Sequence, residues 1–159
     1  MGAFQVLVMN KTAEEAYKPF EKMKFKPFRD ALYLPCSYKC TILHCLQGLE
    51  FAVKAGWFSL KTFDVRDYEF YERVENGDLN WIIPGKFLAF CTPRDETRDK
   101  DGYTHFSPED YVPIFKQKEV KVVCRLNKQE YDPKGFTNHG FKHKSLYFID
   151  GTTPSNELM

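Results

Sequence analysis

The sequence predicts an α/β protein made of two pieces, a mostly helical segment up to about residue 77 and a segment of strands and helices after it. Three observations lead to this prediction. Apolar residues recur at helical spacing in the first segment, and short apolar runs alternate with a helix start in the second. The 159 residues are 43% hydrophobic and 28% charged, which is the balance of a globular domain. The alternation of strands and helices favours a largely parallel sheet.

Two helices are expected before residue 60. The first begins at Thr12, because its hydroxyl and the carboxylate of Glu15 can each accept a hydrogen bond from the other's free backbone N–H, and it should end near Pro19. The second covers about residues 40–55, with Gly56 as its left-handed cap. Its apolar positions recur at spacings of three and four and should form one buried face: Ile42, Leu46, Leu49 and Val53.

A third, acidic helix should begin at Asp64 and end near Glu75, where Asn76-Gly77 breaks it. Arg66 and Arg73 are its only basic residues, and they oppose six carboxylates in and just after the helix: Asp64, Asp67, Glu69, Glu72, Glu75 and Asp78.

Three of these carboxylates could act together. Glu69 and Glu72 are three residues apart and share a helix face, and Asp78 follows just past the helix end. A Lys or Arg of a bound partner could meet all three. The alternative is a solvated helix face with no ligand, and the sequence pattern leaves both interpretations open.

After residue 80, three apolar runs predict strands at residues 86–91, 120–126 and 146–149. A charged loop should cover residues 92–102. Ser107-Pro108 predicts the start of a helix, because proline is favoured at the first helical position.

Composition excludes several functional classes. The net charge is +1, so no overall field favours nucleic acid as a partner. No run approaches the roughly 20 apolar residues that span a bilayer, and the first residues lack the features of a signal peptide. Five cysteines, an odd number, fit reduced thiols better than a disulfide framework. We therefore expect an intracellular soluble protein without nucleic-acid or membrane partners.

Several Cys and His residues invite a chemical interpretation. His44-Cys45 resembles the start of a thiolate phosphatase loop, but Phe51 stands where that loop needs Arg. The pair also lies inside the amphipathic helix predicted at residues 40–55, where the backbone donors are already used, so we interpret Cys45 as a core cysteine. Cys36, Cys40 and His44 are spaced by four, and the outer two would lie about 12 Å apart on a helix, too far for one zinc ion. His139 and His143 form a pair with no fixed partners that could complete a metal site. We expect no metal and no other cofactor.

Asp150 follows the last predicted strand and begins a Gly-Thr-Thr-Pro turn. Because α/β sheets place ligands at the carboxyl ends of their parallel strands, this carboxyl could be a general acid. It could equally be an Asx-type turn residue that only organises the backbone.

Longer segments carry a family resemblance: Asn10–Tyr17, Pro27–Ala31, Tyr68–Asp78, Asn80–Phe87, Arg125–Lys128, Phe136–Phe141 and Phe148–Ser155. Together they resemble the cell-division-cycle-fourteen dual-specificity protein phosphatases of mitotic exit, from about Gly2 to Ser155. The resemblance implies part of a tandem dual-specificity-phosphatase-like fold, with two incomplete α/β lobes joined by an acidic linker helix. Residues 1–62 would be the C-terminal part of a non-catalytic phosphatase-like domain, residues 63–77 the linker helix, and residues 78–159 the N-terminal half of the catalytic domain.

The resemblance also implies roles. Asp150 falls on the family's general acid. The family's acidic groove corresponds here to Glu69, Glu72 and Asp78. In the family, this groove binds a basic residue that follows phosphoserine-proline in phosphorylated proteins. The enzyme would act on phosphoserine, phosphothreonine and phosphotyrosine proteins in cell-cycle control, in the nucleus and cytoplasm, with the nucleolus, centrosome or spindle as further sites.

The sequence departs from the family in one respect. No His-Cys followed by five residues and Arg occurs in it, so the chain has no nucleophile loop. We expect a fragment or truncated member that is inactive alone and that self-associates through open sheet edges. The alternative is a non-catalytic module that binds phosphopeptides or a partner protein.

Overall fold

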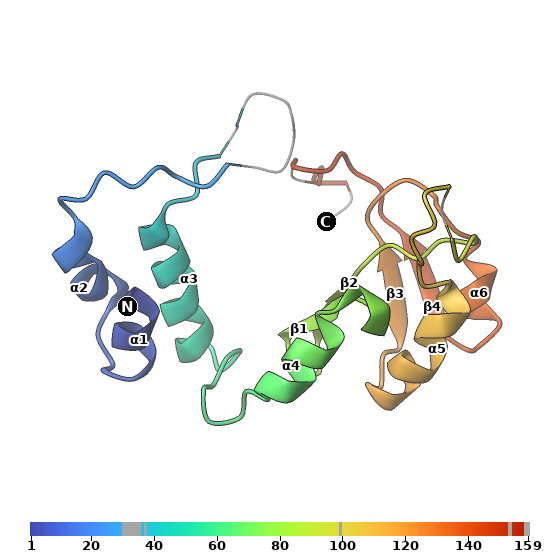
Figure 1. The fold of residues 1–159 in the computed structure, drawn as a ribbon, viewed down its shortest axis with the longest axis horizontal. Helices are drawn as coiled ribbons and strands as arrows, with labels where there is room; N and C mark the ends of the chain where they lie inside the picture. The colour runs from blue at the N-terminus through green and yellow to red at the C-terminus, as the bar shows by residue number, and fades with distance from the viewer. Residues whose placement is uncertain (30–35, 37, 99, 153, 158–159) are drawn as a thin grey trace. The chain divides into compact units, whose positions relative to one another are not determined.

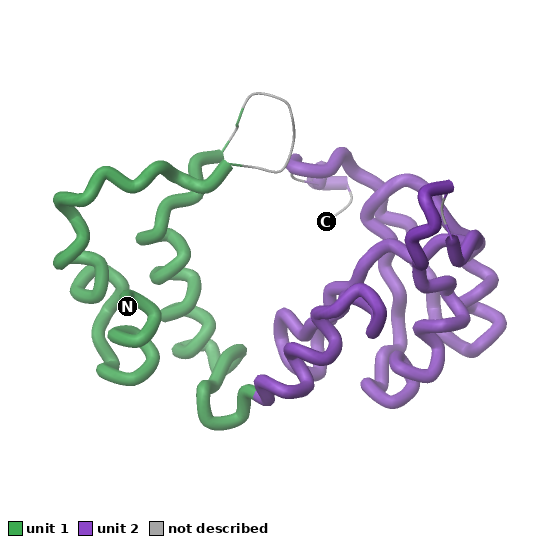
Figure 2. Tube along the Cα trace, in the orientation of Figure 1, with its two compact units in different colours: residues 1–63 green, residues 64–159 purple. Residues whose placement is uncertain are grey.

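The computed structural model describes residues 1–29, 36, 38–98, 100–152 and 154–157. It divides the chain into two compact units, residues 1–63 and 64–159 (Figure 2). The acidic segment after Asp64 therefore belongs to the second unit. The assignment of residues 1–62, 63–77 and 78–159 to two phosphatase domains and a linker stays a prediction.

The first unit is helical (Figure 1). It contains α1 (Gly2–Leu7), which the sequence pattern did not predict, α2 (Ala13–Tyr17) and α3 (Ile42–Lys54), with a 3₁₀ turn at Lys18–Phe20. The predicted capping box of α2 is confirmed: Glu15 N–H donates to the Thr12 hydroxyl, and Thr12 N–H donates to the Glu15 carboxylate at 2.9 Å. α2 ends before Pro19, where the chain tightens into the 3₁₀ turn.

The core of this unit is small. Val6, Ala13, Ala16 and Leu46 are buried, and Ile42 and Leu49 pack against them. Val53 was predicted on the buried face of α3 but is 40% exposed. The reason is length: α1 and α2 have six and five residues, too few to cover the last turn of a 13-residue helix. Gly56 has φ +70°, as expected for a left-handed cap.

The prediction that Cys45 is a core cysteine was wrong. Its side chain is exposed. Cys45 directly precedes Leu46, the buried residue of α3, and one residue along a helix is a rotation of about 100°. That step turns Cys45 out of the apolar stripe.

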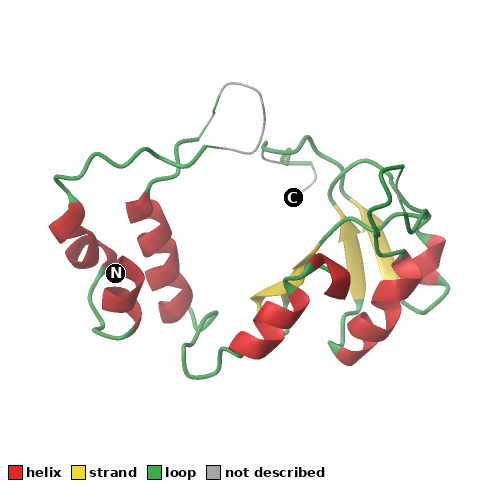
Figure 3. Ribbon diagram, viewed as in Figure 1, coloured by secondary structure: helices red, strands yellow, loops and turns green. Residues whose placement is uncertain are grey.

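The second unit combines helices with two small sheets (Figure 3). Its elements are α4 (Val65–Tyr71), a 3₁₀ turn (Val74–Asn76), β1 (Leu79–Ile83), β2 (Phe87–Phe90), α5 (Pro108–Gln117), β3 (Val122–Arg125), α6 (Lys134–Thr137) and β4 (Lys142–Ser145). Asp64 caps α4 by accepting from Arg66 N–H and Asp67 N–H. The helix stops before Glu75 because the backbone at Arg73 is extended, with ψ 138°.

The sheets are only partly parallel. β3 and β4 pair in parallel, with α6 in the connection between them. β1 and β2 form an antiparallel hairpin, which the expectation of a largely parallel sheet missed together with β1 itself. The connection between them includes Pro84 and Gly85, and Gly85 has φ +71°, a conformation that favours glycine.

The last strand lies four residues earlier than predicted. β4 is Lys142–Ser145, whose side chains are mostly exposed, so its sequence carries no apolar pattern. The predicted residues 146–149 continue beside β3 without forming a regular ladder: Leu146 N–H donates to the Arg125 carbonyl at 2.8 Å, and Phe148 N–H to the Leu126 carbonyl at 3.1 Å.

Aromatic side chains dominate the core of the second unit. The Phe115 and Phe136 rings stack with centroids 5.7 Å apart, and both side chains are almost fully buried. Tyr111 is buried beside them, and its hydroxyl donates to the Gly77 carbonyl at 2.7 Å. This bond anchors the end of the acidic segment to α5. In the described ranges, no helix has both the length and the apolar character to cross a membrane.

Candidate functional site

A pocket of about 490 Å³ lies in the second unit, between the ends of β2 and β3. It is lined by both strands and by the segments that follow them: Leu88, Ala89, Phe90, Thr92, Pro93, Cys124, Arg125, Leu126, Asn127, Tyr131, Phe148 and Asp150. The lining is mostly apolar, with a few polar groups from separate segments. Such a combination is typical of ligand sites.

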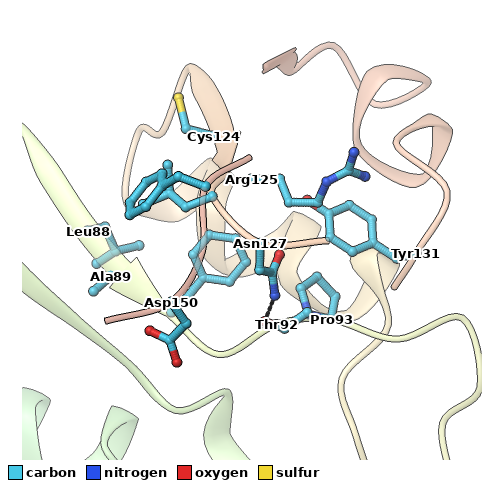
Figure 4. Close-up of a pocket in the computed structure, with 12 residues that line it drawn as sticks. Leu88, Ala89, Thr92, Pro93, Cys124, Arg125, Asn127, Tyr131 and Asp150 are labelled. Carbon is cyan, nitrogen blue, oxygen red and sulfur yellow. Dashed lines mark hydrogen bonds between the residues drawn. The ribbon is translucent and has the colours of Figure 1, made fainter. Parts of the chain in front are cut away.

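Asp150 is the acidic group of this pocket. Figure 4 shows it beside Leu88 and Ala89, with Arg125 and Tyr131 on the other side. The side chain is exposed. An Asx-type turn would need a backbone N–H bound to the carboxylate, but Thr152 N–H donates to the Ile149 carbonyl at 3.1 Å. Among the residues that the structure describes, no hydrogen-bond or ion-pair partner occupies the Asp150 carboxylate, so it is available to a ligand.

Arg125, at the end of β3, is the basic group of the pocket. One guanidinium nitrogen, Nη2, donates to the Ser145 hydroxyl at 2.8 Å. Its Nε and Nη1 atoms are buried and have no hydrogen-bond partner among the described residues. The guanidinium carbon lies 5.7 Å from the centre of the Tyr131 ring. Arg125 thus places positive charge beside the pocket.

Two side-chain pairs fix the remaining polar groups. The Asn127 amide donates to the Thr92 hydroxyl at 2.8 Å, which ties the loop after β3 to the loop after β2 (Figure 4). The Tyr131 hydroxyl and His143 Nε2 are 2.9 Å apart. Burial raises the pKa of Tyr131 to about 12, and burial with the charge of Arg125 lowers the pKa of His143. Both rings are therefore neutral at pH 7.

Glu69 and Glu72 lie one turn apart at the C-terminal end of α4, and both are exposed. The Tyr68 hydroxyl donates to the Glu72 carboxylate at 3.3 Å, and the charge of Glu72 raises the pKa of Tyr68. A third acidic residue of the helix, Asp67, pairs with Lys118 at 3.1 Å. Glu69 and Glu72 thus have no basic partner within the described ranges, and the same is true of Glu75 in the 3₁₀ turn that follows.

Asp78 lies between the 3₁₀ turn and β1, half-buried and in the left-handed conformation with φ +46°. Cys91 N–H donates to the Asp78 carbonyl at 2.9 Å, so Asp78 lies beside the end of β2. Burial and the nearby Asp78 carboxylate raise the pKa of the Cys91 thiol. Glu69 and Glu72 therefore lie on neighbouring turns at one helix end, and no hydrogen bond or ion pair joins the described Asp78 side chain to them. None of the three lines the pocket that contains Asp150. Their convergence on one ligand stays a prediction.

Two of the histidines considered from the sequence, His44 and His143, have side-chain partners. His44 Nδ1 accepts from Thr41 N–H at 3.3 Å and lies 3.1 Å from the Tyr38 hydroxyl. His143 pairs with Tyr131, and His139 lies in the turn after α6. Within the described ranges, no three His, Cys, Asp or Glu side chains are grouped in a way that could hold a metal ion.

Sequence reasoning missed most of the pocket. From the sequence, Arg125 and Asn127 were noted only as members of a segment that resembles the family. No role was predicted for Thr92, Cys124 or Tyr131. One signal was available: Arg125 ends an apolar strand, at the edge where ligands collect in α/β sheets. The Cys124 thiol lies in β3, whose backbone groups pair with β4, so it lacks the free N–H cradle of a phosphatase nucleophile.

Comparison with known proteins gives a consistent result. Residues 1–52 match the family model described as dual specificity protein phosphatase, N-terminal half. The chain is 49% identical over 162 residues to dual specificity protein phosphatase CDC14A of Homo sapiens, and 44% identical over 162 residues to tyrosine-protein phosphatase cdc-14 of Caenorhabditis elegans. Both alignments cover 100% of this chain but only 27% and 23% of the relatives. The chain thus spans about a quarter of their length, and the resemblance predicted from the sequence is confirmed.

Proposed function

Because the chain belongs to the CDC14 family of dual specificity phosphatases, we propose that it supplies the general acid and the substrate groove of a cysteine-dependent protein phosphatase in cell-cycle control. The observation that carries the proposal is the Asp150 carboxylate, which is exposed at a pocket between two strand ends and has no partner among the described residues. Such a carboxylate can exchange its proton with a ligand.

The chemistry divides between two parts of the enzyme. A cysteine thiolate attacks phosphorus and forms a sulfur–phosphorus bond as the phosphorus–oxygen bond to the substrate breaks. Asp150 donates its proton to the departing serine, threonine or tyrosine oxygen. The thiolate belongs to a His-Cys loop that ends in Arg, and the 159 residues contain no such loop.

The acidic residues supply the specificity. Glu69 and Glu72 are exposed on one turn of α4, and Asp78 follows two residues after the 3₁₀ turn. We propose that the three carboxylates bind the Lys or Arg that follows phosphoserine-proline in the substrate. Unlike Asp67, which pairs with Lys118, Glu69 and Glu72 meet no basic side chain in the described part of the chain, so a substrate cation can take that place.

The first prediction tests whether hydrolysis needs a nucleophile that these 159 residues do not contain. The 159-residue chain should not hydrolyse para-nitrophenyl phosphate above background, because loss of the nucleophile removes the covalent step entirely. A chimera that joins this chain to the part of human CDC14A following the aligned segment should hydrolyse it. Steady-state release of nitrophenol measures both. Activity of the chain alone that disappears in Cys124→Ser would overturn the proposal, because the pocket would then hold its own nucleophile.

A second candidate function rests on the absence of the nucleophile motif. A chain with a free acid, an acidic helix end and no thiolate loop could bind basic phosphopeptides without hydrolysis. Titration of the 159-residue chain with a phosphoserine-proline-lysine peptide separates the two. Micromolar binding by this chain together with an inactive chimera would favour the binding module.

The second prediction concerns self-association. Within the described residues, β2 and β3 each pair with one neighbour only, and large apolar side chains on or beside the strands are exposed, among them Val122 at 43% and Phe87 at 66%. Open strand edges with apolar side chains invite pairing between chains. We expect oligomers of the purified chain in light-scattering chromatography, and fewer of them for Val122→Lys. A sharp monomer peak for the unaltered chain would contradict the prediction.

A further inference from the structure

Two thiols face each other at the start of α3. Cys40 Sγ and Cys45 Sγ are 3.7 Å apart, within hydrogen-bond distance for sulfur. Cys45 is exposed, and Cys40 is partly so. The proposed function uses neither residue.

The geometry of the helix start explains this contact. Thr41 is the N-cap of α3 and forms a capping box with His44. Cys40 is therefore the residue before the cap and Cys45 is the fourth residue of the helix. Side chains at these two positions commonly pack against each other and fix the direction in which the chain enters the helix. Here the packing pair consists of two thiols.

The backbone holds both residues in place. Phe28 N–H donates to the Cys40 carbonyl at 2.7 Å, in an isolated antiparallel bridge, and Cys45 N–H donates to the Thr41 carbonyl at 3.1 Å within the first turn. A disulfide needs the sulfurs at about 2 Å, so they must approach by less than 2 Å, a distance within reach of side-chain rotation.

We propose that Cys40 and Cys45 are an oxidation site, at which a peroxide converts the thiol pair into a disulfide that fastens the chain before α3 to the helix. In reduced intracellular surroundings such a bond forms only under oxidative conditions and is reversed by thiols.

The chemistry balances with one peroxide per disulfide. The exposed Cys45 sulfur attacks a peroxide oxygen, the O–O bond breaks, and the leaving hydroxide takes the thiol proton as water. The Cys40 sulfur then attacks the resulting sulfenic sulfur, the S–O bond breaks, and a second water carries away the Cys40 proton. The hydrogen bond with Cys45 raises the pKa of Cys40, so Cys40 keeps its proton until this second step.

The sequence offers a direct readout. Trypsin cleaves after Lys39 and Lys54, and the peptide of residues 40–54 contains Cys40 and Cys45 and no other cysteine. The purified 159-residue chain is treated with hydrogen peroxide, blocked with N-ethylmaleimide and digested. We expect this peptide to lose two hydrogen atoms and take no label, and to take two labels when dithiothreitol precedes the block. The matched control is Cys124→Ser, which removes an exposed thiol in the second unit and should leave the result unchanged.

Two variants guard against a false positive. In Cys40→Ser and in Cys45→Ser the remaining thiol has no partner across the cap, so the peptide should gain oxygen or cross-link between chains instead of closing on itself. The inference is overturned if the unaltered peptide keeps two labels while Cys91 or Cys124 is oxidised. It is equally overturned if the disulfide joins two chains and disappears on dilution, or if it joins Cys45 to Cys36.

Discussion

Asp150→Asn in the chimera with the CDC14A segment should lower kcat/KM for a phosphoserine-proline-lysine peptide by roughly 100- to 10,000-fold, the range that general acid catalysis contributes. Asparagine keeps the shape of the side chain but has no acidic proton to give to the departing serine oxygen. A serine alkoxide is a poor leaving group, so the loss of that proton falls directly on the rate.

An aryl phosphate separates this role from a structural one. Nitrophenolate leaves without a proton, so hydrolysis of para-nitrophenyl phosphate by Asp150→Asn should fall far less than hydrolysis of the peptide. The fold should be unchanged, because no described residue is bound to the Asp150 carboxylate and the turn is held by the Thr152 N–H bond to Ile149. Glu157→Gln, an exposed carboxylate in the same terminal segment, is the control. Equal losses on both substrates would show that Asp150 supports the pocket and is not the acid.

The sequence predicted best those features that depend on neighbouring residues. The capping box of Thr12 with Glu15 joins side chains to backbone groups three residues away, so the pattern is visible in a short window. The start of α5 was predicted from Ser107-Pro108 in the same way, because proline is favoured at the first helical position. β2 and β3 were likewise predicted, because each is a short apolar run.

Features that depend on distant partners escaped prediction. β4 is held by backbone bonds to β3 while most of its side chains are exposed, so its residues show neither alternation nor an apolar run. The pocket has the same difficulty. Arg125, Tyr131 and Asp150 are brought together by the β3–β4 pairing and by the backbone bonds of Leu146 and Phe148 to the end of β3, and no local pattern encodes that arrangement. Asp150 alone could be predicted as a candidate, from its place after an apolar run.

The wrong prediction for Cys45 shows that a shift of one residue in a helical pattern is enough to misplace a side chain. Cys45 was assigned to the core because it lies inside an amphipathic helix, yet the buried stripe runs through its neighbour Leu46. Periodicity locates a helical face to within about one residue, and one residue is enough to turn a side chain from the core to solvent.

Removing the three carboxylates of the proposed groove should reduce activity selectively. In the chimera, the triple change Glu69→Gln, Glu72→Gln and Asp78→Asn should lower kcat/KM for the phosphoserine-proline-lysine peptide by roughly 30- to 800-fold. A clustered, partly desolvated set of charge pairs contributes roughly 2–4 kcal/mol, and about 1.4 kcal/mol corresponds to a factor of ten. A single exposed pair contributes only about 0.2–1 kcal/mol, so each single change should cost much less than the triple change.

The local structure makes these substitutions mild for the fold. Glu69 is exposed, and Gln at residue 72 can still accept the hydrogen bond from the Tyr68 hydroxyl. Asn is among the few residues that tolerate the left-handed backbone of residue 78, where φ is +46°. Glu75→Gln, in the same acidic segment but outside the proposed groove, is the matched control and should leave kcat/KM unchanged.

Substrate choice decides between a specificity groove and a structural acidic helix. A peptide with Ala in place of Lys should be hydrolysed nearly equally by the unaltered and triple-variant chimeras, as should para-nitrophenyl phosphate, because neither has a cation for the carboxylates to bind. Higher salt should shrink the difference seen with the Lys peptide, since partly exposed charges are screened within about 8–10 Å at physiological ionic strength. If the triple variant lost activity equally on all three substrates, the carboxylates would be stabilising the fold around α4 and β1, and the proposed recognition of a basic residue would be wrong.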